Sequence, residues 1–253
     1  MLTNLFYKSI IENNLERLIL IKGVFMKALI VLTNVEKYGE YNRLTGLWLS
    51  ELTHFYDELN QAGVEFDFVS PKGGYVPLDP HSLTMMDDID RQYYHNEEFR
   101  NRALGNTLSP DQVKAEAYDL IYYTGGHGTM WDFPESTAIA KIASKIYQNG
   151  GLVTAVCHGV AGLLPIKDEN NEPLISGKVV TGFTNHEEEL NGTVNMVPFM
   201  TQDALSQKGA IVEVEQSFTP VVKVDNRLLT GQNPQSARAL GKATLEYLSN
   251  QKK

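Results

Sequence analysis

The sequence lacks most features that mark secreted, membrane-bound or nucleic-acid-binding proteins. It has one cysteine in 253 residues, which excludes an internal disulfide and a cysteine-rich zinc site. Its formal net charge is −9, and no basic run is long enough to follow a phosphate backbone. It also lacks internal repeats and low-complexity tracts. Nucleic acid is therefore not an expected partner.

The N-terminal segment has neither the length of a membrane span nor the order of a signal peptide. Charged residues interrupt the apolar cluster at residues 15–21, which is too short to cross a bilayer. A basic region followed by an apolar region and a small-residue cleavage site is also missing. We interpret residues 1–25 as an N-terminal extension and a candidate misassigned start before Met26. Residues 26–253 are then a single domain, expected in the cytoplasm and away from membranes.

Strand and helix patterns alternate along residues 26–253, and the hydrophobic content of 42% suffices for a sizeable core. Continuous apolar runs predict strands at 28–32, 65–69, 118–124, 152–156 and 178–181, followed by a hairpin of 221–224 with 228–230. Helical spacing predicts helices over 48–59, over 139–146 and from Pro234. Residues 71–110 lack strand patterns, so we expect an inserted cap with a short helix near 96–104. The fold class is α/β, a doubly wound sandwich.

Cys157 follows an apolar strand and precedes small residues, which is the arrangement of a nucleophile elbow. Gly159 allows the backbone to turn tightly there. The free N–H groups of a helix start would favour a thiolate. The alternative is a buried cysteine that serves as a small hydrophobic residue. The flanking sequence favours the nucleophile.

Other polar residues are expected near Cys157, because ligands bind at the carboxyl ends of parallel strands. The glycine-rich turn 125–128 could point N–H groups at an oxyanion, or could be a plain tight turn. Glu51 flanks an apolar helix face, so it is either a partly buried carboxyl with a raised pKa or a surface glutamate. His158 could act as a base or serve only as a backbone spacer, and an acid within 187–189 could orient it or merely begin a helix.

Together these residues resemble the ThiJ/PfpI superfamily and, within it, the glyoxalase III-like heat-shock chaperone branch. The resemblance covers residues 26–248 and rests on five motifs in the family's order. These motifs are Thr45-Gly46 with Glu51, the Gly125–Thr129 turn, Ala155–Gly159, Gly177–Thr184 and Leu229–Ser236.

The resemblance implies a flavodoxin-like fold and, usually, a homodimer. It also implies roles for residues of this chain: Cys157 as nucleophile with His158 as its partner, Glu51 against the thiol, Glu188 as the acid that orients His158, the N–H groups of Gly126 and His158 as an oxyanion site, and Gly125 and His127 in binding. Glu187 is one residue from Glu188 and is the alternative for that acid. Some members of the branch carry a His/Glu metal site, but its ligands have no match here, so we predict no metal.

The implied reaction converts methylglyoxal to lactate without glutathione, through a hemithioacetal on Cys157. It needs no cofactor, and the substrate is a small aldehyde. Related members are also described as protein deglycases, proteases or chaperones.

Three other functions are compatible with parts of the sequence. A class I glutamine amidotransferase would use a His-x-Glu pair, which residues 186–188 spell, although they follow Cys157 closely. A cysteine peptidase or amidase would use the same nucleophile in an open cleft. A holdase chaperone without enzymatic activity would need an exposed apolar patch instead.

Overall fold

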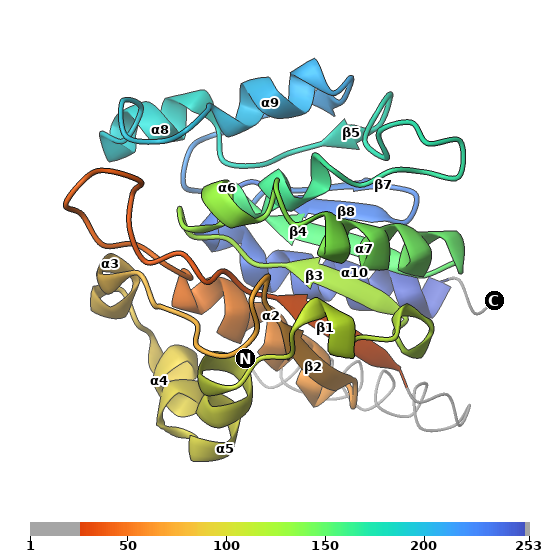
Figure 1. The fold of residues 1–253 in the computed structure, drawn as a ribbon, viewed down its shortest axis with the longest axis horizontal. Helices are drawn as coiled ribbons and strands as arrows, with labels where there is room; N and C mark the ends of the chain where they lie inside the picture. The colour runs from red at the N-terminus through yellow and green to blue at the C-terminus, as the bar shows by residue number, and fades with distance from the viewer. Residues whose placement is uncertain (1–25, 251–253) are drawn as a thin grey trace, which may run out of the picture.

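The computed structural model describes residues 26–250, which form a six-stranded sheet with helices on both faces (Figure 1). The strand order is β2-β1-β3-β4-β8-β7, and only β7 runs antiparallel to its neighbour. The strands are β1 (Lys27–Val31), β2 (Glu65–Val69), β3 (Leu120–Tyr123), β4 (Leu152–Val156), β7 (Val222–Asp225) and β8 (Leu228–Gly231). Within residues 26–250, no helix has the length and apolar character needed to cross a membrane.

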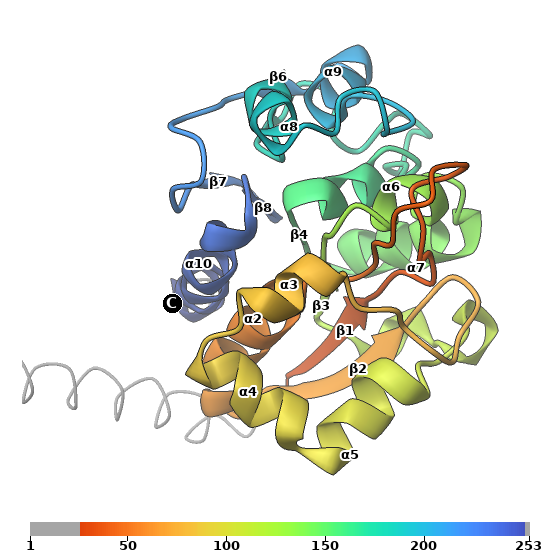
Figure 2. The ribbon, with the colours of Figure 1, turned by 90° about the vertical axis from the view of Figure 1, so that its left-hand side faces the viewer.

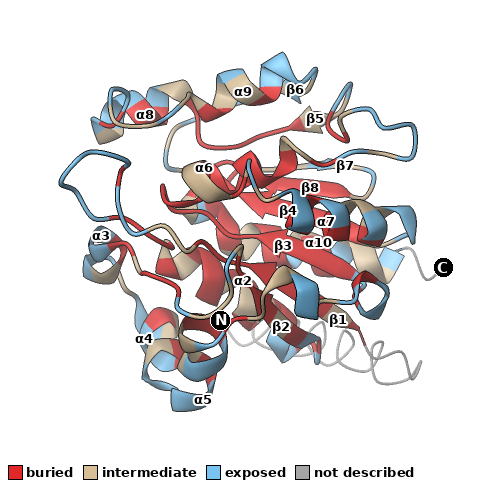
Figure 3. Ribbon diagram, in the orientation of Figure 1, coloured by how far each residue is buried: buried red, intermediate tan, exposed pale blue. Residues whose placement is uncertain are grey.

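Two apolar cores lie on opposite faces of this sheet. Side chains alternate between faces along a strand, so Ala28 and Ile30 of β1 enter one core, while Leu29 and Val31 enter the other. The first core is covered by α2 (Leu49–Gln61) and α10 (Ala237–Asn250), and the second by α7 (Thr137–Gln148) and the 3₁₀ helix η4 (Cys157–Leu163). The central strands are buried, whereas the helices expose their outer faces (Figure 3). This arrangement confirms the doubly wound sandwich.

Most strands lie where the apolar runs predicted them, and the β7–β8 hairpin is confirmed. The strand predicted at 178–181 differs, because β5 (Val179–Val180) pairs with β6 (Ile211–Val212) in a separate two-stranded sheet. The last helix begins as a 3₁₀ turn, η5 (Pro234–Ser236), before it continues as α10.

The insertion 71–110 is more helical than expected, and most of it lies away from the elbow. It forms α3 (Pro80–Thr84), α4 (Asp88–His95), α5 (Glu97–Arg100) and a π-helix at Asn101–Gly105. Tyr93 and Phe99 pack on Tyr56 of α2, so these helices cover α2 and the β2 edge. Figure 2 shows them beside α2, with α8 (Asn185–Asn191) and α9 (Thr201–Gln207) at the other end of the molecule. Glu188 of α8, and not a residue of the insertion, bonds His158 beside the elbow.

Five short helical elements complete the described chain. They are η2 (Pro110–Gln112), η3 (Ala115–Ala117), α6 (Thr129–Asp132), η4 and η5. The expected extension at residues 1–25 lies outside the described residues, so the candidate start at Met26 stays a prediction.

Candidate active site

The candidate site lies at the carboxyl ends of β3 and β4, next to the point where the strand order reverses at β1. A glycine-rich turn after β3 packs directly against the elbow after β4. A Cβ atom on Gly125 would lie 2.5 Å from Glu51 Oε2 and 3.0 Å from the Gly159 nitrogen. Gly126 has φ +96°, and a Cβ there would lie 2.2 Å from the Gly46 carbonyl oxygen. Only glycine allows these backbones to approach so closely.

Cys157 has the backbone of a nucleophile elbow. Its φ is +56°, a left-handed conformation that costs a non-glycine residue free energy. A Cβ on Gly159 would lie 2.4 Å from the Thr124 carbonyl oxygen, so the turn after Cys157 is pressed against the end of β3. The Cys157 side chain is only 2% exposed.

Glu51 is fully buried on the first turn of α2. Its Oε2 accepts a hydrogen bond of 2.7 Å from the Gly125 N–H, and among the described residues Oε1 has no conventional hydrogen-bond partner. Burial raises the pKa of Glu51 to about 8, and interactions with the Cys157 thiol and the Gly125 N–H oppose that rise. Glu51 is thus a buried acid beside the nucleophile and not a surface glutamate.

The thiol and the Glu51 carboxyl ionise as a coupled pair. Burial raises the pKa of the Cys157 thiol well above its usual value, the charge of Glu51 adds to the rise, and the His158 backbone N–H opposes it. Two adjacent buried acids do not readily carry two negative charges, so ionisation of one opposes ionisation of the other. This differs from the thiolate expected at a helix start, because η4 is a short 3₁₀ helix and burial outweighs its dipole.

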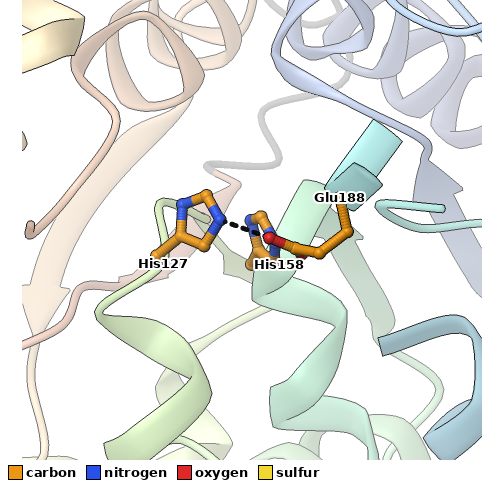
Figure 4. Close-up of side chains that lie close together, drawn as sticks. All are labelled: His127, His158 and Glu188. Carbon is orange, nitrogen blue, oxygen red and sulfur yellow. Dashed lines mark hydrogen bonds and ion pairs between the residues drawn. The ribbon is translucent and has the colours of Figure 1, made fainter. Parts of the chain in front are cut away.

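Glu188 of α8 holds two histidines at once (Figure 4). Its Oε2 lies 2.8 Å from His158 Nε2, and its Oε1 lies 2.9 Å from His127 Nε2. The Thr193 hydroxyl also donates to Oε1. Burial alone would raise the pKa of Glu188, but the charge of His158 and the hydrogen bonds from both histidines hold it well below its usual range. Glu188 is therefore an ionised acceptor.

The ionised Glu188 assigns the protons of both rings, because a carboxylate can only accept hydrogen bonds. Each Nε2 then carries a hydrogen, and His158 Nδ1 faces Cys157 Sγ at 3.4 Å, where the neutral ring has a lone pair. Burial lowers the pKa of His127 to about 4, and the charge of His158 adds to that effect. His127 is thus neutral at physiological pH. The arrangement can accept a proton from the thiol at His158 Nδ1.

The two acids that the sequence left open have different surroundings. Glu188 faces His158, whereas the Glu187 carboxylate accepts hydrogen bonds from Thr184, Phe218, Gln232 and Asn233.

The amidotransferase alternative requires His186 near Cys157, and the structure does not place it there. His186 lies on the surface with Glu189, 3.5 Å between Nδ1 and Oε2, and both side chains are largely exposed. The His-x-Glu pair at 186–188 therefore does not reach Cys157.

Aromatic side chains around the histidines were missed by sequence reasoning. The Phe183 ring lies 4.2 Å from that of His158, and the Tyr38 ring lies 4.9 Å from that of His127. Phe183 belongs to the motif 177–184, and its presence in that motif was the signal that could have placed it near the site. Gly125 and His127, expected in binding, already use the Gly125 N–H and His127 Nε2 within the protein, on Glu51 and Glu188 respectively.

Within residues 26–250, two groups of side chains have donor atoms close enough to hold a metal ion. They are His127 with His158 and Glu188, and His54 with Asp87 and Asp90. In the first group the histidine Nε2 atoms are already hydrogen-bonded to the carboxylate. In the second, Asp87 and Asp90 form the capping box of α4. Neither group requires an ion to account for its contacts.

The fold and the site together define an α/β protein with a buried cysteine at a strand-to-helix elbow. The model of the DJ-1/PfpI family matches residues 45–247. The chain belongs to the DJ-1/PfpI family, which confirms the resemblance drawn from the five motifs.

Curated relatives match over most of their length. The protein called glyoxalase 3 of Candida albicans is 32% identical over 223 residues, covering 84% of this chain and 94% of that protein. The glutathione-independent glyoxalase HSP31 of Saccharomyces cerevisiae is 33% identical over 220 residues, covering 81% and 90%.

Solved structures of similar chains share the whole fold. The Rapid Encystment Protein 24 KDa of Francisella tularensis aligns with a TM-score of 0.85 at 39% identity, over 88% of this chain and 99% of that one. Glyoxalase III of Candida albicans aligns with a TM-score of 0.80 at 30% identity, over 88% and 97%.

Proposed function

We propose that this protein is a glutathione-independent glyoxalase that converts methylglyoxal to lactate. One observation carries the proposal: the single thiol of the chain lies beside the buried Glu51 carboxyl and 3.4 Å from His158 Nδ1. The relatives named as glyoxalases support the same reaction class.

The reaction begins with attack of Cys157 Sγ on the aldehyde carbon of methylglyoxal. The thiol proton passes to His158 Nδ1, which Glu188 holds through the opposite ring nitrogen. The aldehyde oxygen gains negative charge and then a proton, which completes a hemithioacetal. We assign the N–H groups of Gly126 and His158 to stabilise that oxygen, because backbone donors near a developing charge lower the barrier.

Glu51 then moves a proton between the two carbons. A carboxyl whose burial raises its pKa to about 8 can take a proton from carbon and return it. Removal of the C1 hydrogen gives an enediol, and its return to C2 gives a thioester of lactate. Water hydrolyses the thioester and frees the thiol. The aldehyde carbon is oxidised while the ketone carbon is reduced, so no external redox cofactor is required.

The test is lactate formation from methylglyoxal by purified protein in the absence of glutathione. We expect turnover by the wild type and none by Cys157→Ala. Absence of turnover by the wild type, or equal turnover by the variant, would reject the proposal.

The other activities considered from the sequence have less support. A peptidase needs a thiol that a peptide chain can reach, and Cys157 is buried. A holdase role would survive in Cys157→Ala, so suppression of aggregation by that variant would separate it from catalysis. We further propose a cytoplasmic homodimer, which light scattering after gel filtration would test through the molar mass.

A further inference from the structure

The buried carboxylate of Glu187 has no part in the proposed reaction, yet five hydrogen bonds converge on it. Oε2 accepts from the backbone N–H and the hydroxyl of Thr184, both at 3.0 Å. Oε1 accepts from the Phe218 N–H at 2.8 Å, from Gln232 Nε2 at 3.2 Å and from Asn233 Nδ2 at 2.8 Å. Each of these donors is neutral. A buried carboxylate surrounded by neutral donors holds them in fixed directions, because it can only accept.

The donors come from three segments that are distant in sequence. Thr184 caps α8, Phe218 lies in the loop before β7, and Gln232 and Asn233 follow β8. The two amides also reach into that loop, since Gln232 Oε1 accepts from the Glu215 N–H at 2.9 Å and Asn233 Nδ2 donates to the Thr219 carbonyl at 2.9 Å. Glu187 thus joins α8, the loop 215–219 and the end of β8. Within the 229–236 motif, Gln232 and Asn233 are thus the residues that bond Glu187.

Two of these segments are connected to His158 through one further side chain, Glu188 for α8 and Phe183 for the loop. The capping box of Thr184 and Glu187 fixes the start of α8, and Glu188 on that helix bonds His158. Phe218 has φ +54°, a strained conformation for a bulky residue, and Glu187 accepts its N–H. The Phe218 ring lies 6.2 Å from Phe183, which lies against His158.

We propose that Glu187 is a positioning residue that holds His158 in register with Cys157, through Glu188 on one side and the Phe218–Phe183 wall on the other. This proposal rests on the function proposed above. Glu187 touches neither Cys157 nor His158 through any of its hydrogen bonds, so its effect on the reaction is exerted through those neighbours.

The decisive measurement is alkylation of Cys157 by iodoacetamide, followed by mass spectrometry. The chain has one cysteine, so the rate reports on this thiol alone. Burial is the main cause that raises the pKa of the thiol, and the charge of Glu187 adds to it. Removal of that charge alone would therefore speed alkylation. Loss of the position of His158 Nδ1 would slow it. The two roles predict opposite signs.

We expect Glu187→Gln to slow alkylation at pH 7 and to lower kcat/KM for methylglyoxal by about 10- to 100-fold, the usual effect of losing a partner that orients an active-site group. Glu187→Asp keeps the charge and should recover part of the alkylation rate and part of kcat/KM. Gln232→Met removes one of the five donors to Glu187, together with the contacts of Gln232 to Glu215 and Thr181. It should change the alkylation rate and kcat/KM in the same direction as Glu187→Gln, by a smaller factor. It keeps the test available if Glu187→Gln does not fold.

The matched control is Asp57→Asn. Asp57 is another buried carboxylate with several donors, but it bonds Tyr93, Gln61 and Arg238 at the far part of α2. We expect it to lower the melting temperature with unchanged alkylation and kcat/KM. Unchanged or faster alkylation in both Glu187→Gln and Gln232→Met would overturn the proposal. If the wild type made no lactate, the proposed function would fail, while alkylation would still decide the role of Glu187.

Discussion

At the scale of single residues, the central feature is a buried thiol beside a buried carboxyl whose charge raises the pKa of the thiol. Cys157 and Glu51 are both buried, so neither water nor a surface side chain can take over their roles in the reaction. The sequence predicted the nucleophile from its elbow. It could not establish the burial of Glu51, because helical spacing gives the face of a residue but not what packs against it.

Removal of either partner should abolish lactate formation almost completely. In the proposed reaction the thiol forms the covalent bond and the carboxyl transfers the proton, so neither is sufficient alone. The double variant Cys157→Ala/Glu51→Gln should be little worse than each single variant, because residues that act as a unit are non-additive. Steady-state lactate assays would show this. Independent, multiplicative losses would indicate that the two residues act in separate steps.

Glu51→Gln should also change the pH dependence of stability. The native state keeps the Glu51 proton up to about pH 8, whereas a glutamate in an unfolded chain has an ordinary pKa of 4.5. Between these values the unfolded state binds fewer protons, so the free energy of unfolding falls as the pH rises. The variant mimics the protonated acid, so at pH 8 its free energy of unfolding should be higher than that of the wild type by on the order of 2–4 kcal/mol. Urea unfolding of both proteins at pH 5 and pH 8 would measure this difference. An equal change in the free energy of unfolding between the two pH values for wild type and variant would contradict the prediction.

At the scale of elements, short α8 brings the acid to the histidines. The residues alone predicted an acid after a strand at this point, and the family resemblance indicated Glu188 with Glu187 as the alternative. The choice depends on the rotation of α8, which the Thr184 cap and the long-range contacts of Glu187 determine. The insertion 71–110 was harder to place for a similar reason. Its Tyr93 and Phe99 have apolar partners on α2 and β2, and sequence does not show such tertiary contacts.

Glu188→Gln should lower turnover by about 10- to 1000-fold, which is less than loss of the nucleophile. The substitution keeps the shape but removes the charge that fixes the tautomer of His158. Glu189→Gln is the matched control on the same helix, because Glu189 is exposed and pairs only with His186. Comparison of kcat for the two variants tests the assignment. Equal effects would mean that α8 acts through its stability and not through Glu188.

At the scale of the whole molecule, sequence was sufficient for the sandwich because buried parallel strands are continuous apolar runs. It was not sufficient for β5, a two-residue strand whose partner lies 32 positions away at β6, since pairing of such short strands depends on tertiary contacts.

A fragment of residues 26–253 should fold and keep its activity. The described residues, from Met26 onward, supply two apolar cores and the site between α2, η4 and α8. Circular dichroism melting and the lactate assay would compare the fragment with the full chain. Loss of solubility would show that residues 1–25 pack on the domain.

The hydrogen bond between Glu51 and the Gly125 N–H has a stereochemical consequence. It anchors the carboxyl to the turn after β3, so in the proposed reaction the proton can return to the planar enediol from one direction only. The two faces of that plane give mirror-image products. The released lactate should therefore be a single enantiomer, which chiral chromatography would reveal, whereas a racemic product would mean that bulk water and not Glu51 supplies the proton.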